Sequence, residues 1–318
     1  MFDEANWDLA PGLTEGALTL SLSAETCNLN YWINAVAQGT WHGLVNGHKP
    51  EAQTPDRMKQ PGPLRDAMIE ELGYRSIAEE LAARALSYLV IHAPDISTME
   101  FYLTQAIDEA RHASIFRGHL FEMGIREDEL ATVLERYVGE QRKQVLEPLE
   151  AWVLSVVRDQ GDFIGGVVLF TIMVEGVLAP AAEISERKWR LIDPAAAQIE
   201  HGANIDEIRH LTVGASIIQQ HLQRRPEDKP RILELIKAGV SKWKELPTAH
   251  VTLRREALFQ QGMADLRDLL QGYELIPGTL LIETDPQARM DIANKMTREL
   301  QEGRLRFMGL EEAIEFLA

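Results

Sequence analysis

The sequence has little of several features that would place it in common protein classes. It contains one cysteine, Cys27, so an internal disulfide is impossible and a reducing compartment is expected. Basic residues are in deficit, with 32 Lys and Arg against 49 Asp and Glu. The formal net charge of −17 argues against binding to nucleic acid or to an anionic membrane surface. Glycine and proline are not concentrated in any stretch that resembles a linker.

Long apolar runs are also missing. The longest, FIGGVVLFTIMV, extends from Phe163 to Val174 and is too short to span a bilayer, which needs about 20 residues. The first residues, MFDEANWDLA, are acidic and lack the basic and apolar regions of a signal peptide. With 45% hydrophobic and 25% charged residues, the 318-residue chain has an ordinary globular composition. We therefore expect a cytoplasmic protein that acts without a membrane and without nucleic acid.

Helical periodicity extends through most of the chain. It predicts long helices over residues 63–92, 95–124, 127–157, 162–191 and 193–222, and further helices over 229–246, 253–273 and 286–303. The fourth of these should be kinked or broken at Pro180. Only GTLLIE, residues 278–283, has strand character. The pattern predicts an all-α fold in one domain over residues 1–318, with an antiparallel bundle core at about 63–222 and accessory helices at about 228–318.

One hexapeptide, Ile-Asp-Glu-x-Arg-His, occurs twice, once ending at His112 and once at His210. A single Glu-x-x-His match is expected by chance in a chain with nine histidines, but two copies that also share the flanking residues are not. Residues i and i+3 lie on one face of a helix, so Glu109 with His112, and Glu207 with His210, can each bind one metal ion. The alternative is a pair of solvated surface side chains.

A first helix should supply a third glutamate. The turn between the first two long helices centres on Pro94, and Glu79 lies fifteen residues before it while Glu109 lies fifteen after it. In an antiparallel hairpin these two residues are level. Glu80 is the alternative, but its helical neighbours include Arg84, which indicates a solvated face.

A fourth glutamate follows from the same reasoning. The turn between the fourth and fifth helices centres near Leu191, with Glu175 sixteen residues before it and Glu207 sixteen after it. Glu175 lies within LFTIMVEGVLA, where a carboxylate would be costly to bury without a partner such as a metal ion.

This pattern resembles the ferritin-like non-haem di-iron oxygenases, and in particular the hydroxylase subunits of the soluble di-iron monooxygenases. The resemblance covers roughly residues 70–222. It implies a ferritin-like, ribonucleotide-reductase-like four-helix core, two iron ions, O2 as co-substrate, and no catalytic side chains beyond the metal ligands. The implied ligands are Glu79, Glu109, His112, Glu175, Glu207 and His210, with Glu109 and Glu207 as the bridges between the ions.

The resemblance also implies partners for the histidines. Asp108 and Asp206 would each hydrogen-bond the histidine of the opposite hexapeptide, which orients that ligand through its other ring nitrogen. Arg111 and Arg209 would neutralise the two aspartates.

Three positions depart from the patterns of related groups. Ala179 stands where the monooxygenases have a threonine one turn after the glutamate, which leaves room for a substrate above the metals. Phe116 replaces the radical-forming tyrosine of ribonucleotide reductase subunits, and Ala203 replaces an additional histidine of aryl-amine N-oxygenases. The catalytic hydroxylase subunits are also considerably longer, so the size is closer to stand-alone di-iron enzymes of bacterial natural-product pathways, including azoxy-forming ones.

These likenesses favour an O2-dependent oxygenase of a biosynthetic pathway that oxygenates the nitrogen of a small amine or hydrazine to an N-oxide or azoxy-type product. A C–H hydroxylase or desaturase and a non-catalytic iron-storage or scaffold subunit are the alternatives. The chain has no Gly-rich nucleotide motif and no cysteine cluster, so a separate electron donor or reductase, or a reducing substrate, is expected. We also expect a homodimer.

Overall fold

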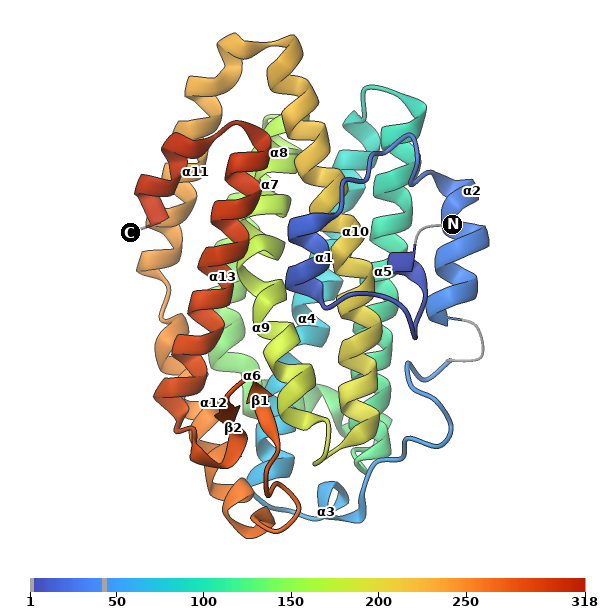
Figure 1. The fold of residues 1–318 in the computed structure, drawn as a ribbon, viewed down its shortest axis with the longest axis vertical. Helices are drawn as coiled ribbons and strands as arrows, with labels where there is room; N and C mark the ends of the chain where they lie inside the picture. Colours follow the sequence, from blue (N-terminus) through green and yellow to red (C-terminus); the bar gives the residue numbers. More distant parts are fainter. Residues whose placement is uncertain (1–2, 42–44, 318) are drawn as a thin grey trace.

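The computed structural model describes residues 3–41 and 45–317, and this part of the chain is almost entirely helical (Figure 1). Its α-helices are α1 (Leu13–Thr19), α2 (Leu29–Tyr31), α3 (Asp56–Lys59), α4 (Pro63–His92), α5 (Ile96–Glu122), α6 (Leu130–Gln141), α7 (Glu147–Leu154), α8 (Phe163–Val168), α9 (Glu175–Trp189), α10 (Pro194–Arg224), α11 (Lys229–Glu245), α12 (Thr248–Met263) and α13 (Pro286–Met308). Strands β1 (Glu274–Ile276) and β2 (Thr279–Leu280) form a small antiparallel hairpin. The all-α prediction is confirmed.

Four long helical segments form the core of the bundle: α4, α5, the α8–α9 segment and α10 (Figure 1). Their ends carry the expected signals. Pro63 and Pro194 occupy first helical positions, where a missing N–H costs nothing. Asp95 and Asp193 cap α5 and α10 by accepting hydrogen bonds from the backbone N–H of the third helical residue, at 2.8 and 3.2 Å. These caps fix where neighbouring helices begin and hence which residues lie level with one another.

Several helices contain π-helical turns that the sequence did not predict. The predicted helix at 127–157 is a continuous helical path in which π-turns at Arg142–Leu146 and Ser155–Asp159 separate α6 from α7 and end α7. In the fourth helix, the predicted break at Pro180 is wrong, because α9 continues through this buried proline. The irregularity is a π-turn at Leu169–Val174, directly before Glu175. A π-turn widens the helix by one residue, and such turns are frequent at functional sites.

The accessory helices pack against the core. α12 lies against α4, and α13 lies against α9 and α10. The predicted helix at 253–273 is too long, because α12 ends at Met263 and a 3₁₀ turn and further turns follow. Leu270 in this region is fully buried, so its apolar side chain reaches the core from a turn and not from a helix. GTLLIE contributes β2 and a short 3₁₀ turn.

One helical segment of the described residues, Phe163–Trp189, is long and apolar enough to cross a membrane by length and composition alone. It exceeds the twelve-residue apolar run because the helix continues beyond Glu175. Its apolar window is 72% buried inside the protein. This is the position of a core helix, whose apolar surface contacts other helices of the bundle.

Candidate metal centre

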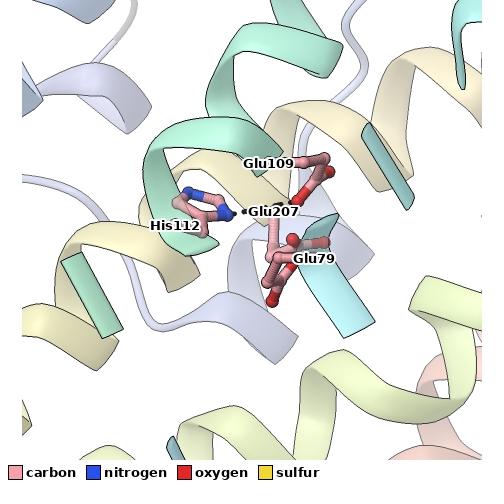
Figure 2. Close-up of side chains that lie close together, drawn as sticks. All are labelled: Glu79, Glu109, His112 and Glu207. Carbon is pink, nitrogen blue, oxygen red and sulfur yellow. Dashed lines mark hydrogen bonds and ion pairs between the residues drawn. The ribbon is translucent and has the colours of Figure 1, made fainter. Parts of the chain in front are cut away.

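Acidic and imidazole side chains from all four core segments meet inside the bundle. They form two groups that share Glu109, and within each group the ligand atoms lie within 4.8 Å of one another. The first group is Glu79, Glu109, His112 and Glu207 (Figure 2), and the second is Glu109, Glu175 and His210. The structure therefore brings together all six side chains that the sequence singled out, and Glu109 is placed to bridge two ions.

Each histidine directs Nδ1 toward the glutamate carboxylates of the centre and Nε2 toward an aspartate on the other side of the ring. Nδ1 of His112 lies 3.2 Å from Oε2 of Glu109, and Nδ1 of His210 lies 3.2 Å from its Oε1. On the other side of each ring, Nε2 of His112 is 3.2 Å from Asp206 and Nε2 of His210 is 3.2 Å from Asp108. Each aspartate thus contacts the histidine of the other hexapeptide, and this crossed arrangement is the one that the resemblance implies.

The two arginines of the repeat are not equivalent. Arg209 is buried and forms ion pairs with both aspartates, with its Nη2 close to Asp108 and 3.3 Å from Oδ1 of Asp206. Arg111 lies 3.6 Å from Asp206 and places its guanidinium over the Trp41 ring, 4.8 Å from the centroid. Arg209 is therefore the main counter-charge for both aspartates.

We expect Asp108→Asn and Asp206→Asn to fold normally but to weaken iron binding by about 10–100-fold, the usual effect of changing a partner of a metal-ligating histidine. The amide can still accept a hydrogen bond from Nε2, but the negative charge that makes the imidazole a better donor is lost. Iron titration against a competing chelator measures the change. Asp128→Asn, at an exposed position, is the control, and equal affinities in all three variants would show that the two buried aspartates have no such role.

Glu79 and its neighbour Glu80 have different environments. Glu79 is partly buried and lies with the other potential ligands. The Glu80 side chain is 48% exposed and pairs with Arg84 at 2.8 Å and Arg117 at 3.5 Å. The structure thus places Glu79, and not Glu80, in the candidate metal centre.

This difference predicts the metal content of two neighbouring variants. Glu79→Ala should lose one of two iron ions, because Glu79 belongs to only one of the two groups. Glu80→Ala should keep both. Iron quantification after anaerobic reconstitution provides the measurement, and the reverse result would show that the first-helix ligand is assigned wrongly.

The donor set fits a pair of iron ions. Among the described residues, Oε1 of Glu109, Oε2 of Glu207 and Nδ1 of His210 are buried and form no hydrogen bond, and the first and the last of these atoms are in contact only as an ion pair at 3.2 Å. Buried polar atoms are rarely left unsatisfied, and a bound cation would satisfy all three. Carboxylate and imidazole ligands suit iron or manganese and differ from the thiolate ligands of structural zinc sites.

The pKa shifts show how protons balance these charges in the metal-free protein. Burial raises the pKa of Glu79 and Glu175 well above the usual range for a carboxyl group. Burial also raises the pKa of Glu109, but the two histidines outweigh it and hold the pKa well below its usual range. Burial lowers the pKa of His112, but its hydrogen bonds to Asp206 and Glu109 raise it to about 10, and Glu109 likewise raises the pKa of His210. Metal ions must displace protons from these groups, so metal affinity should rise with pH.

Two further side chains contact this centre, and the sequence patterns did not identify them. Nε2 of Gln105 donates a 2.5 Å hydrogen bond to Glu175. Nε1 of Trp32 donates a 2.9 Å hydrogen bond to Asp108. Gln105 lies one turn before Glu109 on the same helical face, so its spacing was a usable signal.

The three residues that depart from the family patterns have different surroundings in the structure. Ala179 packs with Leu13 and Ala17 of α1, Leu211 of α10 and Leu300 of α13. The small side chain therefore makes room for the neighbouring helices, and this placement does not support the expected space above the metals. Phe116 is fully buried with its ring 6.4 Å from that of His112, and Ala203 is part of the apolar core.

Comparison with known proteins supports the fold. No family model matches the sequence, and no curated protein matches it. Among solved structures, a Synechococcus protein described as having aldehyde deformylating oxidase activity matches with a TM-score of 0.56 and 19% sequence identity. The match covers 82% of this chain and 98% of that one. At this level of identity the likeness shows a shared helical fold.

Proposed function

We propose that this protein is an O2-dependent non-haem di-iron oxygenase. The observation that carries the proposal is the pair of buried ligand groups joined by Glu109, in a fold shared with a protein of oxidase activity. When bound, two iron ions would supply the activation of O2, which no side chain can provide.

The residues of the chain would orient and insulate this centre. Asp108 and Asp206 hold the two histidines with Nδ1 directed inward, and Arg209 balances the aspartates. Gln105 fixes one oxygen of Glu175 by its hydrogen bond. Buried apolar side chains before Glu175, including Phe170, exclude water from this side of the bundle. Exclusion of water strengthens the electrostatic interactions within the site.

We further propose oxygenation of nitrogen in a small amine or hydrazine, on the basis of the likeness to azoxy-forming natural-product enzymes. The fold likeness to a protein with aldehyde deformylating oxidase activity supports carbon chemistry as the second candidate. Electrons would come from a separate donor or reductase, or from a substrate that is itself reducing, such as a hydrazine. A homodimer remains part of the proposal, and light scattering in solution tests it.

Single turnover with 18O2 tests the reaction. The iron-loaded, chemically reduced protein is mixed with matched amines, hydrazines and aldehydes of equal chain length, and products are analysed by mass spectrometry. We expect the label in an N-oxygenated product. Label in a C-hydroxylated product, or cleavage of the aldehyde, would replace nitrogen by carbon chemistry. Rapid iron oxidation without any organic product would indicate iron storage, and the metal-free protein is the control.

A further inference from the structure

A cleft of about 440 Å³ lies along the part of α10 that precedes the candidate metal ligand Glu207. Its walls are the loop before α1, the α9–α10 hairpin and the β1–β2 hairpin. Asn204, on its α10 wall, precedes the metal ligand candidate Glu207 by one helical turn. The volume is within the range of small-molecule sites in proteins, about 300–1,000 Å³.

The polar side of this cleft is built around Glu186. This buried carboxylate accepts a 2.8 Å hydrogen bond from Nη2 of Arg190 on one oxygen and a 2.9 Å hydrogen bond from Nδ2 of Asn204 on the other. Nδ1 of His201 lies 3.4 Å from the first oxygen, and its Nε2 lies 3.0 Å from the carbonyl oxygen of Trp7. The oxygens of Glu186 therefore already have partners.

The cleft has one hydrogen-bond acceptor and one set of N–H donors that a ligand could use. Oδ1 of Asn204 is buried and has no hydrogen-bond partner among the described residues, and Asn204 itself is only 3% exposed. This atom can only accept a hydrogen bond. The side chain of Arg190 is half-exposed. Its guanidinium uses Nη2 for the hydrogen bond to Glu186, so N–H groups on its other nitrogens can donate to an anion.

We propose that this cleft binds a small amino carboxylate with an apolar body. The ligand's carboxylate pairs with Arg190 and its amino N–H donates to Oδ1 of Asn204. Because Arg190 and Asn204 contact the two oxygens of a single carboxylate, the amino and carboxylate groups of the ligand are close together, as in an α-amino acid. The lining of the cleft also includes the apolar side chains of Pro11, Leu13, Ile276 and Pro277, which would contact the ligand's body.

The binding inference goes beyond the proposed reaction and does not depend on bound iron. It can therefore be tested on the metal-free full-length protein, and its outcome is separate from that of the 18O2 experiment. Three probes of nearly equal size separate the contributions: L-phenylalanine, 3-phenylpropanoate without the amino group, and 2-phenylethylamine without the carboxylate. Isothermal titration calorimetry should show L-phenylalanine binding at least about tenfold more tightly than either of the others, since each lost contact leaves a polar group unpaired.

Two variants locate the site. Arg190→Gln should weaken L-phenylalanine binding at least about tenfold and leave 2-phenylethylamine unchanged. Arg142→Gln is the matched control, because Arg142 is exposed to a similar extent and also pairs with one glutamate, Glu147, at a different place on the surface. Asn204→Leu should remove the preference for L-phenylalanine over 3-phenylpropanoate.

The proposal is overturned if the three probes bind equally or none binds. It is also overturned if Arg190→Gln and Arg142→Gln have the same affinity for L-phenylalanine. Arg190 is exposed, so its variant should fold normally and the result does not depend on how well Asn204→Leu folds.

Discussion

Replacing Glu109 with alanine is expected to remove both metal ions and to abolish O2 consumption. Glu109 is the one side chain that belongs to both ligand groups, and its two oxygens lie 3.2 Å from the two histidine nitrogens that face the centre. Without it, each group loses an anionic donor, and the two histidines lose the carboxylate between them. Iron quantification after anaerobic reconstitution should give two ions per chain for the unaltered protein and close to none for Glu109→Ala.

A buried carboxylate outside the centre supplies the control for this variant. Glu200 is on α10, is fully buried, and pairs with Arg75 at 3.2 Å. Glu200→Gln should therefore keep both iron ions, even if the protein is less stable. Retention of one tightly bound ion in Glu109→Ala would show that the two groups bind metal independently and that Glu109 does not bridge them.

The long core helices were predictable because local signals coincide with the hydrophobic pattern. α4 begins at Pro63 and ends at His92, as predicted, since proline fits the first helical position and Pro94 cannot continue the helix. α10 begins at Pro194 behind its Asp193 cap for the same reason. The π-turns were not predictable in this way. They differ from an α-helix in one hydrogen-bond step, and residue type does not determine that step.

The candidate ligands were predictable because their positions depend on helical spacing and on two short turns. Contacts from the N-terminal segment were not. Trp32 contacts Asp108 from a π-helical stretch, Trp32–Trp41, which follows the three-residue helix α2, and residue type does not determine such a stretch. The cleft along α10 was not predictable for the same reason, since the loop before α1 and the β1–β2 hairpin form walls that only the tertiary fold brings together.

The accessory helices are joined to the core by a buried ionic network centred on Lys188 of α9. Its Nζ lies 3.0 Å from Glu71 of α4 and 2.6 Å from Glu256 of α12. Nε of Arg289, on α13, donates a 2.5 Å hydrogen bond to Glu256. These four residues are at most 5% exposed. Although burial opposes it, Lys188 and nearby arginines hold the pKa of Glu71 well below its usual range, so this buried carboxylate is ionised at neutral pH.

Lys188→Met is therefore expected to lower the free energy of unfolding by about 3–5 kcal/mol, the cost of removing one partner from a buried ion pair. Methionine fills similar space but leaves two buried carboxylates with less positive charge near them. Urea denaturation of the metal-free protein, followed by circular dichroism, measures the change. Lys143→Met is the matched control, because its pair with Glu135 is exposed on both sides and is screened by solvent, so its loss should change stability little. Equal denaturation midpoints for the two variants would show that the network does not hold α12 and α13 on the bundle.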